Sequence, residues 1–181
     1  MAFNINLFQG ALKFGGARPT HFQVIITNPV NSVGDIQTPF LTKAAKIPES
    51  TIQPIELFYF GRPIKLAGNR TYEDMELTII NDEDFAIRHA LEDWANHINS
   101  AENNLRALSD ASPILYKSTA LVTQFSKTGG PLRVYEFVNI WPSSIGAIDL
   151  TWDEATTVEE YPVTFTYDYW KVSGGTTGTL R

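Results

Sequence analysis

The sequence contains no cysteine among its 181 residues, which excludes disulfides, thiolate metal ligands and cysteine nucleophiles. It also lacks any apolar run near the ~20 residues that a membrane-spanning helix needs. Its first residues have neither the basic start nor the apolar stretch of a secretory signal. From these absences we expect a protein that does not insert into membranes and is made in the reducing cytoplasm of a cell.

Clustered positive charge is missing as well. The 14 Lys and Arg residues are scattered singly and the net charge is −6, whereas proteins that bind nucleic acid neutralise phosphates with such residues. We therefore expect no specific binding to nucleic acid. A mildly acidic chain is typical of a soluble protein, and it is also suited to letting DNA pass nearby without sticking.

Catalytic and metal-binding motifs are not found either. His89 and His97 are eight residues apart on a predicted helix, which separates them by ~12 Å along the axis, too far for one metal ion. The acidic residues at 73–76 and 159–160 fit a solvated surface better than an acid–base pair. The glycine pairs lack the spacing of phosphate-binding loops. We expect no enzyme activity, no cofactor and no metal.

What the sequence does contain is a series of strand-like segments. Apolar and polar residues alternate through residues 161–170, which predicts a strand with one buried and one wet face. Further strands are predicted at residues 21–27, 51–60, 72–80 and 132–141. Gly61 ends the second of these, and residues 127–131 are typical of a hairpin connection.

One long helix is predicted among these strands, at about residues 82–100. Asn81 and Asp82 provide a helix cap, and one apolar stripe follows at helical spacing, formed by Ile87, Leu91, Trp94 and Ile98. The predicted fold is mainly β, an antiparallel barrel or sandwich with this helix packed against it. It forms a single domain over residues 1–181, with an N-terminal arm at 1–18 and a flexible tail at 173–181.

Three segments resemble the tail tube proteins of contractile-tailed bacteriophages. The first, residues 58–72, has aromatic-Gly-Arg followed by Gly-x-Arg-x-aromatic, and the second, residues 80–94, has an acidic helix start followed by Ile-Arg and Trp. The third, residues 135–170, has an aromatic-Asn-x-x-Pro turn and a closing Tyr-x-Tyr-Trp strand. The segments occur in the family's order and cover roughly residues 40–170.

This resemblance implies a structural subunit of the inner tail tube. Such subunits form hexameric rings in which sheets from neighbouring copies join into one continuous inner barrel. The rings stack into a hollow tube that delivers DNA without binding it specifically. The implied partners are further copies, the tail sheath protein, baseplate tube proteins, the tape measure protein and the tail terminator protein. The implied location is the virion tail, after assembly in the cytoplasm of a host bacterium.

Two sets of residues are candidates for contacts in such a tube. Contact between rings is assigned to a segment that exposes two isoleucines around a predicted turn, together with the N-terminal arm: Ile47, Pro48, Glu49, Ser50, Thr51, Ile52, Phe3 and Ile5. The alternative is that Ile47 and Ile52 are core residues of an ordinary hairpin. The lumen is assigned to polar strand positions, although the pattern does not say which face is inward: Asp74, Glu76, Thr78, Thr164, Thr166 and Asp168.

Two other functions fit parts of the sequence. One is a tube subunit of a phage-derived contractile injection system, or a baseplate tube component of the same fold. The other belongs to a different class, a β-sandwich module that binds carbohydrate or protein. Its ligand platform would be Trp141, Trp152 and Trp170.

Overall fold

The computed structural model describes residues 5–12, 16–106, 112–153 and 156–179. Nine strands dominate this part of the chain, and the longest helix is α3. In chain order the elements are α1 (Ile5–Ala11), β1 (Phe22–Ile26), the 3-10 helix η2 (Ser32–Gly34), α2 (Thr38–Leu41), β2 (Thr42–Ala45), β3 (Ser50–Tyr59), β4 (Arg62–Tyr72), β5 (Met75–Ile80), α3 (Ala86–Ile98), α4 (Pro113–Tyr116), β6 (Ser118–Phe125), β7 (Pro131–Ile145), β8 (Glu160–Thr166) and β9 (Tyr169–Gly174).

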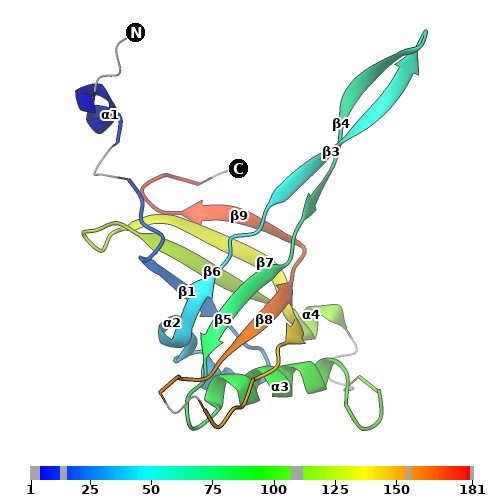
Figure 1. Ribbon diagram of the computed structural model, residues 1–181. Coiled ribbons are helices and arrows are strands. Elements are labelled where there is room, and N and C mark those ends of the chain that lie inside the picture. The colour runs from blue at the N-terminus through cyan, green and yellow to red at the C-terminus, as the bar shows by residue number, and fades with distance from the viewer. Residues whose placement is uncertain (1–4, 13–15, 107–111, 154–155, 180–181) are drawn as a thin grey trace.

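Seven of the strands form one antiparallel sheet, which curves into two layers around β7 (Figure 1). The strand order is β1-β6-β7-β8-β5-β2, and β9 also pairs with β7. The first ten residues of β7 pair with β6, while β8 pairs with residues 141–145 of β7. This arrangement confirms the prediction of a mainly β, antiparallel fold.

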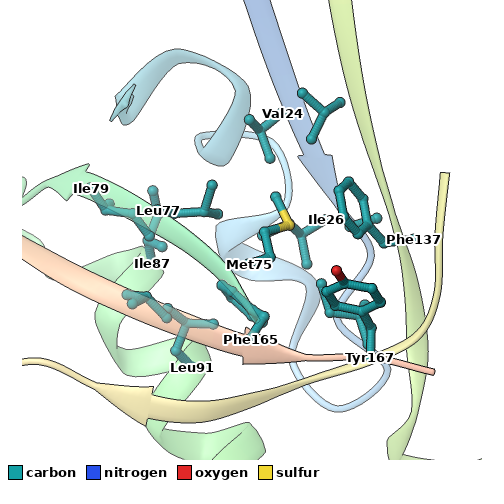
Figure 2. Close-up of a cluster of buried hydrophobic side chains, with 14 of the residues drawn as sticks. Val24, Ile26, Met75, Leu77, Ile79, Ile87, Leu91, Phe137, Phe165 and Tyr167 are labelled. Carbon is teal, nitrogen blue, oxygen red and sulfur yellow. The ribbon is translucent and has the colours of Figure 1, made fainter. Parts of the chain in front are cut away.

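The core lies between the two layers. Val24 and Ile26 of β1 belong to the same buried cluster as Met75 and Leu77 of β5, although three strands stand between β1 and β5 in the sheet order. Figure 2 shows these side chains pointing toward one another, with Phe165 of β8 beside them. Burial of these apolar side chains is the main favourable contribution to folding.

Helix α3 covers one end of this core (Figure 1). Its side chains Ile87, Leu91 and Trp94 are buried, and Ile98 is partly buried against the same cluster. The Trp94 indole nitrogen donates a hydrogen bond of 2.7 Å to the backbone oxygen of Tyr116. Helix α3 is thus held in place both by packing of its apolar stripe and by the hydrogen bond of the Trp94 indole.

The predicted bounds of the helix were wrong at both ends, since it runs from Ala86 to Ile98. Phe85, just before it, has a left-handed backbone with φ of 53°, which cannot continue a right-handed helix. The Asp82 and Asp84 side chains accept hydrogen bonds from the backbone N–H groups of Glu83 and Ala86. These acids therefore form a separate turn. Besides the one predicted helix, the described residues contain four shorter ones: α1, α2, α4 and η2.

The strand predicted at 161–170 is two strands, β8 and β9, separated by a bend at Tyr167 and Asp168. The backbone N–H of Asp168 donates to the oxygen of Val138, next to Asn139, whose φ of 61° is left-handed. The bend shifts the alternation of buried and exposed side chains, so that Tyr169 is exposed. The sequence pattern also missed β2, β4 and β6.

The C-terminal segment differs from the flexible tail predicted from residue 173. Strand β9 continues to Gly174, and the backbone N–H groups of Thr176 and Thr177 donate to the oxygens of Pro131 and Leu132. Hydrogen bonds therefore hold the chain against the start of β7 as far as Thr177.

Replacing Trp94 by Ala should remove the largest side chain shared by α3 and the sheet. We expect the free energy of unfolding to fall by about 3–5 kcal/mol, because a fully buried indole leaves a cavity. The same change at Trp152, which is fully exposed, should alter it by less than about 0.5 kcal/mol. Urea unfolding followed by circular dichroism measures both, and equal losses would contradict this account of the core.

Candidate assembly surfaces

The most distinctive feature is a two-stranded ribbon formed by β3 and β4, which projects away from the rest of the fold (Figure 1). Within the described residues these strands pair only with each other, in a register from Ser50 opposite Tyr72 to Tyr59 opposite Arg62. From Ile52 onward every residue of β3 is exposed. A lone two-stranded ribbon is at best marginally stable in water, so contact with another surface would stabilise this one.

The two faces of the ribbon differ in chemistry. Residues directly opposite each other in a pair point to the same side, so one face carries four half-exposed aliphatic side chains, here named the aliphatic face: Ile55, Leu57, Ile64 and Leu66. The other face carries an ion pair between Lys65 and Glu56, with a distance of 3.6 Å from Nζ to Oε1. A contiguous exposed aliphatic surface of this kind marks an interaction site.

The end of the ribbon carries three aromatic side chains, which together we name the tip: Phe58, Tyr59 and Phe60. Phe60 and Gly61 form the two-residue turn, both with positive φ, 46° and 79°. Asn or Gly is favoured at such positions, because a side chain with a Cβ strains the left-handed backbone. Phe60 nevertheless occupies one of them and is 90% exposed. A strained and exposed aromatic residue is unfavourable in a lone subunit, which points to a contact with another molecule.

The base of the ribbon is anchored to the body. The backbone N–H of Glu73 donates to the oxygen of Glu49, and the Tyr167 hydroxyl donates to the oxygen of Glu73. The Tyr72 ring lies 6.2 Å from the rings of both Tyr167 and Trp170. Burial raises the pKa of Tyr167 above its ordinary value, so that its hydroxyl remains a donor. These contacts set the direction in which the ribbon points.

The segment assigned to ring stacking forms this base and contains no turn. Pro48 is buried, Ile47 is half-buried, and Ser50 and Thr51 pair with Tyr72 and Thr71. Within residues 47–52 only Glu49 and Ile52 are exposed. The pattern of Phe58 to Phe60 before Gly61 predicted a strand, but periodicity alone does not distinguish an exposed ribbon from a core strand.

A second exposed apolar surface lies on α1 at the N-terminus. Ile5, Leu7 and Phe8 are all well exposed, and no residue of this helix is buried. Ile5 was assigned to the stacking contact together with Phe3, which lies outside the described residues.

Most of the predicted lumen residues share one surface. Strands β5 and β8 are adjacent, with Glu76 opposite Thr164, while their neighbours Met75 and Phe165 are buried. The polar residues of the two strands therefore point away from the core and form what we name the channel face: Glu76, Thr78, Thr164 and Thr166. Lys46 lies beside this face, 3.9 Å from Glu76 and 3.8 Å from Glu73.

The two remaining lumen candidates lie elsewhere. Asp74 is exposed between β4 and β5. Asp168 lies at the β8–β9 bend, where its carboxylate accepts hydrogen bonds of 2.9 Å from the Lys117 ammonium and 2.6 Å from the Asn139 amide. Both bonds lower the pKa of Asp168 below its ordinary value. We therefore interpret Asp168 as part of a polar clasp across the bend, and not as a free acid of the lumen.

The tryptophans of the alternative ligand platform do not share a surface. Trp141 packs edge-on against Tyr116, Trp170 packs between Tyr72 and Tyr135, and Trp152 is exposed on the β7–β8 connection. In the described part of the chain no group of His, Cys, Asp and Glu side chains has a geometry that could hold a metal ion. No described helix is long and apolar enough to cross a membrane.

The sequence is similar to those of phage tail tube proteins. A family model described as phage tail tube protein matches residues 17–173. The chain is 30% identical over 156 residues to tail tube protein gp19 of Enterobacteria phage T4, covering 86% of this chain and 91% of that protein. It is 24% identical over 151 residues to the tail tube protein of Serratia phage KSP90, covering 81% of this chain and 84% of that protein.

Solved structures share the fold at low sequence identity. A chain from the PVC sheath-tube complex, an extracellular contractile injection system in its extended state, has a TM-score of 0.60 at 15% identity, covering 92% of this chain and 97% of that one. The tube terminating cap of the anti-feeding prophage has a TM-score of 0.63 at 14% identity, covering 88% of this chain and 91% of that one.

Replacing Asp168 by Asn should weaken the clasp across the β8–β9 bend. Because folding lowers the pKa of this carboxyl, its stabilisation is present above the unfolded-state pKa and is lost as pH falls through the folded-state value. We expect a loss below about 1 kcal/mol near pH 7, given the solvent screening of a half-exposed side chain. The difference from wild type should shrink as pH falls below the ordinary aspartate range and vanish once the carboxyl is protonated in the folded state.

A double-mutant cycle with Lys117→Met isolates this interaction, measured as free energies of unfolding across the pH range. A coupling energy that stays constant down to the lowest pH would contradict the role of the Asp168 carboxylate.

Proposed function

The chain belongs to the phage tail tube protein family, and from this membership we propose that it is the structural subunit of the inner tail tube of a contractile phage tail. The observation that carries the proposal is the ribbon of β3 and β4, which projects from a well-packed body with an aliphatic face open to solvent. Its role is structural, and we assign it no catalysis. Its location is the virion tail, after assembly in the cytoplasm of the host bacterium.

Copies of the chain would close into hexameric rings with one continuous inner barrel. Within the described residues β1 pairs only with β6, β2 only with β5 and β9 only with β7, so each presents an unpaired edge. Unpaired edges attract further strands, and closing a ring removes them by strand addition. Because the contact joins two different surfaces, it repeats around the ring until the ring closes.

Stacking of one ring on the next is assigned to the ribbon tip. Its aromatic side chains stand at the far end of the ribbon from the body (Figure 1), about 30 Å along the ribbon at the usual rise per strand residue. The segment at residues 47–52 contributes as the base that directs the ribbon, with Glu49 and Ile52 at its exposed edge. Fully exposed aromatic residues gain the most from burial in such a contact.

The channel face is assigned to the lumen, with Asp74 at its margin. Hydroxyl and carboxylate groups offer no cation that could hold a phosphate. The nearby Lys46 has Glu73 and Glu76 within ion-pair distance, which reduces its attraction for DNA. Repulsion between a lumen of this kind and the phosphate backbone would let DNA slide without specific binding.

The proposed partners are the tail sheath protein around the tube, baseplate tube proteins, the tape measure protein and the tail terminator protein. A second candidate function is a tube subunit of a contractile injection system, because chains of such systems share the fold. The genes beside this one would distinguish the two, since capsid and terminase genes indicate a virus.

Changing Leu57 and Ile64 together to Ser removes two facing side chains of the aliphatic face. We expect this variant to fold, because neither residue belongs to the core cluster. We expect it to remain monomeric, because both residues lie on the surface proposed to contact a neighbouring copy. The matched control changes Glu56 and Lys65, the adjacent facing pair on the other side, to Ser and should still form tubes. Electron microscopy and sedimentation velocity measure both. Long tubes from the first variant would refute the assignment of the ribbon.

Changing Glu76 and Thr164 to Lys should impede DNA without preventing assembly. Each ring would then carry a belt of cations that binds phosphate, and we expect infectivity per assembled particle to fall at least about tenfold. The control carries the same added charge outside the channel face, through Glu102→Lys and Thr151→Lys. Normal infectivity of the first variant, at equal particle numbers, would count against the lumen assignment.

A further inference from the structure

Helix α1 carries an apolar stripe that its own chain leaves uncovered. Ile5 and Phe8 lie three residues apart and share one side of the helix. Leu12, just after the helix, follows four residues later, and its backbone N–H donates to the oxygen of Phe8. Ile5 is 69% and Phe8 is 65% exposed, and the helix contains no charged residue. A helix of seven residues is too short to be stable alone in water. It therefore needs a surface to pack on.

The aliphatic face of the ribbon has the matching chemistry. Its four aliphatic side chains are continued toward the tip by the facing pair Tyr59 and Arg62, while the Glu56–Lys65 ion pair lies on the opposite face. The stretch from Ile55 to Leu57 measures roughly 7 Å and α1 roughly 10 Å, so the helix is long enough to cover it. Contact between the apolar side chains of α1 and the aliphatic face would remove both from water.

The two surfaces do not meet within one chain but are placed to meet between chains. Figure 1 shows α1 and the ribbon on opposite sides of the body, both toward the end farthest from α3. Copies in a ring are related by rotation about one axis. With that axis running from α3 toward this end, both elements would lie at the same end of the ring, and the ribbon of one copy would point toward α1 of its neighbour.

We propose that α1 of each copy packs on the aliphatic face of the neighbouring copy's ribbon within the same ring. This inference rests on the proposed function and adds to it the pair of surfaces that joins neighbours. Each copy offers both surfaces once, so the contact joins unlike surfaces and is satisfied everywhere only when the ring closes. The ribbon tip remains available for the next ring.

The absence of cysteine from the natural sequence allows a direct test by disulfide trapping. Single variants Phe8→Cys and Leu57→Cys are mixed, assembled into tubes and oxidised. We expect a disulfide-linked pair joining the two variants, at a yield at least about tenfold above that of Phe8→Cys with Glu56→Cys, because Glu56 points to the opposite face and cannot reach bonding distance. Ile64→Cys replaces Leu57→Cys if the latter fails to assemble.

The double variant Phe8→Cys/Leu57→Cys shows whether the contact lies within a ring, between rings or within one chain. Contacts within a ring give a ladder of linked chains that ends at the number of copies in one ring. A ladder that extends past that number places the contact between rings, and a disulfide within single chains places α1 on its own ribbon; either result overturns the proposal. Tubes that form without any such disulfide also overturn it while leaving the proposed function intact. If the wild-type chain forms no tubes even with a baseplate tube protein as nucleator, the proposed function itself fails.

Discussion

Strand β7 and its pairing with three other strands set the geometry of the whole subunit. Its first part pairs with β6 on one edge and β9 on the other, and its last residues pair with β8. The bulge at Asn139 and the bend at Asp168 mark the change from β9 to β8. At the same bend, Tyr167 and Trp170 hold Tyr72 at the base of the ribbon. The corner that separates the two layers thus also directs the ribbon.

The molecule is divided between a packed body and two apolar elements, the ribbon and α1, that the body leaves exposed. The core cluster is drawn from β1, β5, β6, β7, β8 and α3, and contains no residue of α1, and none of the ribbon beyond the partly buried Tyr72 at its base. Self-assembly can therefore be selected for without weakening the fold of the subunit. A stable body with projecting apolar elements is the arrangement expected of a subunit that is made as a soluble monomer and then assembled.

The sequence predicted the parts of the structure in which periodicity reflects burial. The α3 stripe, β1 and the buried side of β8 follow their patterns because each has one face in the core. The bend after Thr166 was not predicted, because it depends on hydrogen bonds between Asp168 and two residues of a distant strand, Val138 and Asn139. The pattern predicts a strand at residues 51–60 but not its exposure, because a pattern of apolar residues does not record whether a neighbour from the same chain covers them.

Negative-stain electron microscopy of the purified, untagged protein over a range of concentrations tests whether this chain assembles into a hollow tube. A tube subunit should form hollow filaments of uniform width, or rings that stack into them, above a threshold concentration. A baseplate tube protein is added as a nucleator where spontaneous growth is slow. A chain that remains monomeric at every concentration, even with the nucleator present, is not a tube subunit.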